Sequence, residues 1–194
     1  MSSSFFAMLS RMKYISRWAL MRNTDNETLS EHTLETAYLA HALAELHNTR
    51  FGGSLDCGRI VLMAMYHDVP EILTGDMPTP VKYFNSQLRA AYGEVERAAE
   101  GQLLGALPDD LRPCYEPLIR EELHSDIEHR FVKAADKLSA LIKCIEERKA
   151  GNMEFVTAEQ STLASLHRMD MPEVECFIDE FLPAYSLTLD EQNS

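Results

Sequence analysis

Apolar residues recur at helical spacing along almost the whole chain, and no segment shows the alternation that is typical of a strand. A first helix is predicted over residues 5–15. Thr28, with Glu31 at the position a capping box requires, predicts a second helix that runs to about His47. That helix is apolar on two sides, so we expect it to be central. Its two apolar stripes are Leu34, Tyr38 and His41 on one side, and Leu39 and Leu43 with His32 on the other.

Further helices follow, separated by turn residues. An apolar helix is predicted over residues 55–68, and Pro70 limits its continuation. Ser125 and Glu128 form another capping box, which predicts a long helix that stops at Gly151. We also expect helices from about Asn85 and over residues 155–167 and 172–181. The predicted buried faces are Leu88, Ala91, Tyr92 and Val95 on the helix after Asn85, and Phe131, Ala135, Leu138, Ile142 and Ile145 on the long helix.

Gly75, Pro78 and Pro80 predict an ordered loop between two of these helices. Three prolines between residues 108 and 117 predict short, interrupted helices. The polar tail from about residue 186 is expected to fray. Because no repeat or linker divides the chain, we predict one domain over residues 1–194, with an all-α fold arranged as a globular helical bundle.

Composition narrows the function classes. The 194 residues carry 18 Lys and Arg against 31 Asp and Glu, a net charge of −13 without any basic stripe, which excludes nucleic-acid polymers and anionic membranes as partners. No run approaches the ~20 apolar residues of a membrane span, and no signal peptide is recognised. The four cysteines form no CxxC pair, so we expect mostly buried, reduced thiols in a cytoplasmic protein.

Two histidines and two carboxylates stand out on helices that are predicted to be buried: His32, the adjacent pair His67-Asp68, and Asp136. Neighbours on a helix point about 100° apart, so the pair needs further ligands from other helices. Together the four offer a mixed nitrogen and oxygen shell suited to a first-row divalent ion. One histidine on an apolar helix is more often a core residue, so the signal lies in the ordered set.

This ordered set resembles the HD-domain superfamily of metal-dependent phosphohydrolases, and the match to its bacterial 5′-deoxynucleotidase family is closer still. The resemblance implies an all-α HD domain and a cytoplasmic homodimer. It also implies one divalent metal ion, such as cobalt, manganese or zinc, and deoxyribonucleoside 5′-monophosphates as substrates. The matching strings are RW at 17–18, SEH at 30–32, AMYHD at 64–68, GDMPTPVKYFN at 75–85 and KAADKL at 133–138.

The resemblance also implies roles for individual residues. Arg17 orients the substrate phosphate, Trp18 lies at the nucleoside, and Glu71 lies near the reacting centre. Arg17, Glu71 and Asp76 are the candidate catalytic residues, and how Glu71 and Asp76 divide proton transfer stays open. The chain departs from the family pattern at Val69-Pro70 and at Met77. The metal ligands are His32, His67, Asp68 and Asp136, and the substrate-binding set is Arg17, Trp18, His32, Asp68, Asp76, Met77, Pro78, Thr79 and Asp136.

The expected reaction is hydrolysis of the phosphate monoester by in-line attack of a metal-activated water. Trp18 can exclude a ribose 2′-hydroxyl by shape. Three alternatives remain at this point: an HD-domain hydrolase of nucleoside triphosphates or cyclic phosphodiesters, a catalytically silent nucleotide sensor, and a purely structural all-α protein. The last has no need for the four metal-ligand residues.

Overall fold

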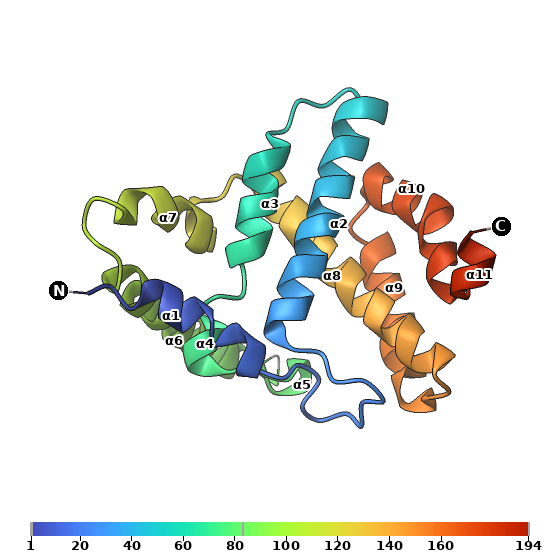
Figure 1. The fold of residues 1–194 in the computed structure, drawn as a ribbon, viewed down its shortest axis with the longest axis horizontal. Coiled ribbons are helices and arrows are strands. Elements are labelled where there is room, and N and C mark those ends of the chain that lie inside the picture. Colours follow the sequence, from blue (N-terminus) through green and yellow to red (C-terminus); the bar gives the residue numbers. More distant parts are fainter. Residues whose placement is uncertain (1, 83, 194) are drawn as a thin grey trace.

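The computed structural model describes residues 2–82 and 84–193. Within that part every regular element is a helix, with one isolated bridge between Ser16 and Thr28 and no strand. Two long helices, α2 (Leu29–Arg50) and α8 (Asp126–Lys149), cross each other, and α3 (Cys57–Tyr66) packs beside α2 (Figure 1). The predicted all-α fold is therefore confirmed.

The remaining elements surround these three helices on two sides. In Figure 1 the N-terminal segment, α4, α6 and α7 lie on one side of α3, and α9 to α11 lie on the other side of α2. The elements are α1 (Phe5–Leu9), η1 (Met12–Tyr14), α4 (Glu71–Thr74), α5 (Thr79–Lys82), α6 (Ser86–Gly105), α7 (Arg112–Ile119), η2 (Glu121–Leu123), η3 (Met153–Phe155), α9 (Val156–His167), α10 (Pro172–Glu180), η4 (Leu182–Ser186) and α11 (Leu189–Gln192).

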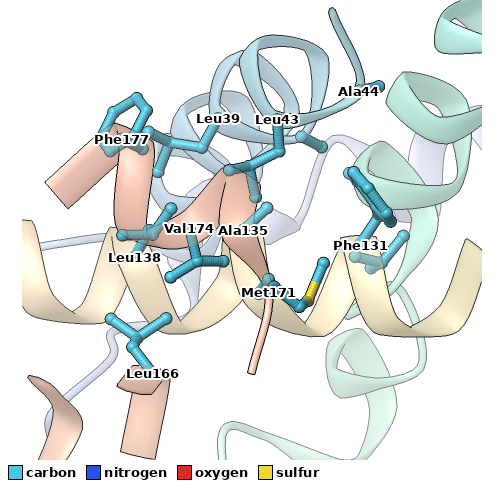
Figure 2. Packing of buried hydrophobic residues seen from close by; sticks show 14 of the residues in the cluster. Leu39, Leu43, Ala44, Phe131, Ala135, Leu138, Leu166, Met171, Val174 and Phe177 are labelled. Carbon is cyan, nitrogen blue, oxygen red and sulfur yellow. The ribbon is translucent and has the colours of Figure 1, made fainter. Parts of the chain in front are cut away.

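The core consists of two clusters of buried apolar side chains. The larger one joins α2, α3, α8, α9 and α10, and Figure 2 shows Leu39, Leu138 and Val174 among its members. The smaller one joins α1, α4, α6 and α7. Helix α2 begins at Leu29 in the smaller cluster and continues into the larger one. Helix α3 belongs to the larger cluster, and the chain that follows it enters the smaller cluster at Val69. His32 and His67-Asp68 therefore lie where the two clusters meet.

Both predicted capping boxes are present. The Thr28 hydroxyl accepts from the Glu31 amide at the start of α2, and Ser125 accepts from the Glu128 amide at the start of α8. Gly151 follows α8 with a φ of 87°, a left-handed conformation that glycine adopts without steric cost. The buried face predicted for α8 is also confirmed.

Two predictions for the N-terminal third were wrong. The expected single helix over residues 5–15 ends at Leu9, because the Ser10 hydroxyl donates to the Phe6 carbonyl and the chain turns there into η1. One of the two apolar stripes of α2 faces outward: Leu34 and Tyr38 are 50% and 68% exposed, and His41 is exposed too. Helix α2 is central because of its other stripe.

Three further predictions were wrong. On α6, Ala91 and Val95 are exposed and only Tyr92 of the predicted face is fully buried, because the core contacts of this helix lie in its C-terminal half. The tail forms α11, which begins with an unforeseen Thr188–Glu191 capping box. Cys114 is exposed. Among the described residues, no helix combines the length and apolar character needed to cross a membrane.

Candidate active site

The four predicted metal-ligand residues converge on one point. His32 Nε2 lies 3.3 Å from Asp68 Oδ2 and 3.3 Å from Asp136 Oδ1. His67 Nε2 lies 3.1 Å from Asp68 Oδ2 and 4.0 Å from Asp136 Oδ1. Two helices and a turn supply them: α2, the turn after α3, and α8. His67 and Asp68 are neighbours in the turn after α3, and their side chains nevertheless meet, with Nε2 and Oδ2 only 3.1 Å apart.

The second nitrogen of each imidazole is held by the protein. His67 Nδ1 lies 2.7 Å from the Ala64 carbonyl, which can only accept, so this nitrogen carries a proton. His32 Nδ1 lies 3.0 Å from Ser139 Oγ, and that hydroxyl donates to Glu35 Oε2 at 2.6 Å. Ser139 therefore accepts from His32. Both Nε2 atoms are directed at the carboxylates, an orientation that suits metal ligation.

Electrostatics at this point favour a cation. Burial and the charge of Arg17 lower the pKa of His32, but hydrogen bonds to Asp136 and Asp68 outweigh them and raise it to about 9. Burial raises the pKa of Asp68 and Asp136, but the neighbouring histidines lower both well below the usual range of a carboxyl group. The two carboxylates are thus ionised and draw positive charge toward the imidazoles.

Polar atoms at the site fit a bound cation and an anionic substrate. Among the described residues, His67 Nε2, Glu71 Oε2 and Arg17 Nε are buried without a hydrogen-bond partner. Buried polar atoms normally have partners, so three such atoms in one place indicate ligands. Two imidazoles and two carboxylates, without a thiolate, are the donors that borderline divalent ions prefer. The residues present therefore fit the metal that the resemblance implies.

A cavity of about 660 Å³ opens beside this point. Arg17 and Trp18 line it, together with Asp136 and the whole predicted substrate loop, Asp76, Met77, Pro78 and Thr79. The structure thus brings together the residues expected to bind substrate. Tyr83, within the same GDMPTPVKYFN string, lies outside the described residues.

Another wall of the cavity was not foreseen from the sequence. It comes from α9, where Ser161, Thr162 and Ser165 present hydroxyl groups beside Ala158. In the sequence these residues belong to an ordinary amphipathic helix, and no motif distinguishes them. Only the packing of α9 against α8 and η3 brings them to the cavity.

The two candidates for proton transfer lie at and just after α4: Glu71 is its first residue, and Asp76 follows its C-cap residue Gly75. Pro70 is the N-cap residue of α4, so the departure at Val69-Pro70 starts the short helix on which Glu71 stands. Burial and the charges of Asp68 and Asp76 raise the pKa of Glu71 to about 10, which keeps this carboxyl protonated at neutral pH. Burial also raises the pKa of Asp76, which accepts a hydrogen bond from the Trp18 backbone.

Comparison with known proteins gives consistent matches. A family profile described as 5′-deoxynucleotidase YfbR-like matches residues 4–185. A 5′-deoxynucleotidase of Erwinia tasmaniensis is 50% identical over 189 residues, covering 97% of this chain and 96% of the relative. The 5′-deoxynucleotidase YfbR of Escherichia coli strain ATCC 8739 is 49% identical over 189 residues, covering 97% and 95%.

Solved structures share the fold. An HD-domain phosphohydrolase from Listeria innocua superposes with a TM-score of 0.83 at 25% identity, covering 98% of this chain and 92% of that one. An HD phosphohydrolase of cyanophage S-2L, described as bound to dA and one catalytic Zn²⁺ ion, has a TM-score of 0.68 at 18% identity, covering 97% and 100%. At that identity the second likeness shows the fold alone.

Proposed function

The chain belongs to the YfbR-like family and is a 5′-deoxynucleotidase, and from this premise we propose how its residues share the reaction. The substrates are deoxyribonucleoside 5′-monophosphates, and the products are a deoxynucleoside and phosphate. One observation carries the assignment: His32, His67, Asp68 and Asp136 converge at the edge of a cavity that Arg17 also lines.

His32, His67, Asp68 and Asp136 hold one divalent metal ion. When bound, this ion supplies positive charge that polarises a phosphoryl oxygen and lowers the pKa of a water molecule. Arg17 binds the phosphate, because its planar fork of donors matches two phosphate oxygens and its Nε is buried without a hydrogen-bond partner in the described part of the chain. Trp18 lies beside the sugar and excludes a 2′-hydroxyl.

Glu71 acts as the general acid in this proposal. Its raised pKa supports the role, because a carboxyl that is protonated at neutral pH can donate to the leaving 5′-oxygen as the P–O bond breaks. Asp76, which lines the cavity, accepts a hydrogen bond from the sugar 3′-hydroxyl. Met77, Pro78 and Thr79 complete the wall at the nucleoside.

The test compares phosphate release from deoxy-AMP and AMP by metal-stripped protein, before and after addition of manganese, cobalt, zinc or magnesium. We expect metal-dependent release that favours deoxy-AMP. Asp68→Ala and Asp136→Ala should abolish it, and full activity of either purified variant would contradict the metal assignment. Assaying pyrophosphate and triphosphate release from deoxy-ATP separates this activity from triphosphate hydrolysis.

The metal is manganese, cobalt or zinc in this proposal, since the N/O donor set suits all three and supply in the cell decides among them. The protein is a cytoplasmic homodimer that binds no nucleic-acid polymer. The exposed apolar side chains of Leu34 and Tyr38 on α2 support self-association, and the net charge of −13 opposes polymer binding. Light scattering on the purified protein measures the mass, and a monomer at micromolar concentration would contradict the dimer.

A further inference from the structure

Glu27 contacts both residues that the proposed function assigns to substrate recognition. Its Oε2 accepts from Arg17 NH1 at 3.0 Å and from Trp18 Nε1 at 2.8 Å. One carboxylate oxygen therefore holds the phosphate-binding group and the sugar-selecting ring together. Glu27 is not among the described residues that line the cavity, so it acts through the side chains that it contacts. Its other oxygen, Oε1, lies 3.8 Å from His32 Nδ1, a longer approach than the two hydrogen bonds of Oε2.

The backbone fixes this carboxylate at the base of the loop formed by residues 17–27, which we call the Arg17 loop. The Arg17 amide donates to the Glu27 carbonyl at 3.0 Å, and the Leu29 amide donates to the Ile15 carbonyl at 2.8 Å. The bridge between Ser16 and Thr28 lies between them. The two ends of the loop thus run side by side into the start of α2, and Glu27 has little freedom to move away from Arg17.

Burial strengthens both contacts. The side chains of Glu27 and Arg17 are only 10% and 12% exposed, so their ion pair is shielded from water and salt. Burial lowers the pKa of Arg17, but the charges of Glu27, Asp136, Asp68 and Asp76 together outweigh it and raise the pKa above its usual value, and Glu27 contributes the most of the four. Among the described residues Arg17 Nε has no hydrogen-bond partner, so pairing NH1 with Glu27 still leaves a donor for phosphate.

Trp18 needs such support, because its backbone is in a conformation that is rare for a bulky residue. Its φ is 60°, in the left-handed region. The side chain is held by the Nε1 bond to Glu27 and by a ring contact with Phe155 at 5.3 Å between centroids. The backbone is held by its interaction with Asp76 and by the Trp18 carbonyl, which accepts from the Met21 amide at 2.9 Å and from Asn23 Nδ2 at 3.4 Å. Of these contacts, only the hydrogen bond from Nε1 to Glu27 holds the polar edge of the indole ring and so fixes how the ring is rotated.

We propose that Glu27 is a positioning residue that couples phosphate binding by Arg17 to selection of the deoxyribose by Trp18. This inference rests on the proposed function, since it assumes the roles given to Arg17 and Trp18. It predicts that the two recognition tasks fail together when the carboxylate is removed, and separately when only one of its two contacts is weakened.

The experiment measures kcat and KM for deoxy-AMP and AMP in three variants. Glu27→Ala loses both contacts, so we expect KM for deoxy-AMP to rise about tenfold or more and the deoxy-AMP/AMP ratio of kcat/KM to fall at least about fivefold. Glu27→Gln keeps an oxygen for Trp18 Nε1 but loses the charge beside Arg17, so KM should rise for both nucleotides while the ratio stays near wild type. Trp18→Phe should lower the ratio with little change in KM.

A double-mutant cycle separates positioning from general damage. Once Glu27→Ala has removed the acceptor, Trp18→Phe should lower the ratio no further. Trp18 is the sole tryptophan, so intrinsic fluorescence gives a readout besides activity: Glu27→Ala should shift emission and increase acrylamide quenching, and Glu27→Gln should not. Glu154→Ala is the matched control, because it removes the acceptor of the Arg22 amide of the same loop and leaves the Glu27 contacts in place.

Each outcome decides one point. A wild-type ratio and unchanged fluorescence in Glu27→Ala would overturn the inference while leaving the proposed function intact. If Trp18→Phe and Trp18→Ala both leave the ratio unchanged, the role proposed for Trp18 is wrong and the inference falls with it. Should Glu27→Ala not fold, Glu27→Gln still tests the coupling, and an unchanged KM in that variant would contradict it.

Discussion

The metal-ligand histidines depend on residues that touch no substrate. Ser139 stands on α8 one turn after Asp136, so a single helix supplies one ligand and the partner of another. Its hydroxyl is fully buried between His32 Nδ1 and Glu35. Because it donates to Glu35, it accepts from His32 and holds the ring with Nε2 toward the carboxylates. Such outer partners orient ligands and tune metal affinity.

Ser139→Ala removes this acceptor, and we expect the affinity for a divalent ion to fall about 10–100-fold. Competition with a chromophoric zinc chelator measures that affinity without any assay of turnover. Ser161→Ala, which deletes a hydroxyl from the cavity wall, is the control and should leave metal affinity unchanged. An affinity for Ser139→Ala within twofold of wild type would show that the hydroxyl does not orient His32.

The raised pKa of Glu71 makes the free energy of unfolding depend on pH, because the folded and unfolded states hold the proton of this carboxyl group with different affinities. Its pKa is about 10 in the folded, metal-free protein and near 4.5 when unfolded. The folded state therefore favours the protonated form, so its contribution to stability is fully present below pH 4.5 and is lost as pH rises toward 10. Glu71→Gln cannot ionise. In metal-stripped protein the variant should gain thermal stability over wild type as pH rises from 5 to 9, while turnover of the loaded enzyme falls; a pH-independent difference in Tm would contradict the raised pKa.

At the scale of elements, the start of α2 connects stability to the site. Thr28 caps α2 directly after Glu27, whereas Ser125 makes the same capping box on α8, away from the Arg17 loop. Losing a cap of this kind costs about 1 kcal/mol. The two helices thus offer a matched pair of substitutions, one beside the Arg17 loop and one remote from it.

Thr28→Ala and Ser125→Ala should each lower Tm by roughly 2–4 °C. We expect only Thr28→Ala to raise KM for deoxy-AMP, because its cap fixes the end of the loop that carries Arg17. Differential scanning calorimetry and steady-state kinetics on both variants check this. Equal kinetic effects would mean that the loop is held independently of the α2 cap.

The elements that the sequence predicts well are those specified locally. Both capping boxes and the buried face of α8 depend on residues a few positions apart, so pattern alone identifies them. The outward stripe at Leu34 and Tyr38 and the exposure of Val95 depend on which helix packs where, which no local pattern encodes. The same division holds at the site: the four metal-ligand residues follow from motif resemblance, whereas the α9 wall and Glu27 follow only from the fold. Ser139 lies three residues after Asp136 on the same helix, so a local signal for its role is present in the sequence.

At the scale of the whole molecule, Glu147 connects the Arg17 loop to the C-terminal half of the chain. Its carboxylate accepts from the Thr24 amide at 2.8 Å, from the Asp25 amide at 3.2 Å, from Lys143 Nζ at 2.6 Å and from Asn152 Nδ2 at 2.8 Å. Figure 1 shows the loop before α2 extending toward the end of α8, where these contacts lie. Segments more than a hundred residues apart therefore share one buried carboxylate.

Glu147→Gln should destabilise the protein by about 3 kcal/mol at pH 7, because it leaves the Lys143 charge buried without its partner. Burial raises the pKa of Glu147, but hydrogen bonds from Lys143, Asn152 and the two loop amides lower it to about 2. A lowered pKa means that the carboxylate stabilises the fold above about pH 4.5 and loses this effect as pH falls toward 2. The difference in free energy of unfolding between wild type and variant should therefore shrink from pH 7 to pH 3 in urea titrations. Glu154→Gln is the control, because Glu154 is exposed and contacts the same loop, and it should show neither effect. If the difference between wild type and Glu147→Gln stays constant with pH, packing and not the charge of Glu147 holds the loop.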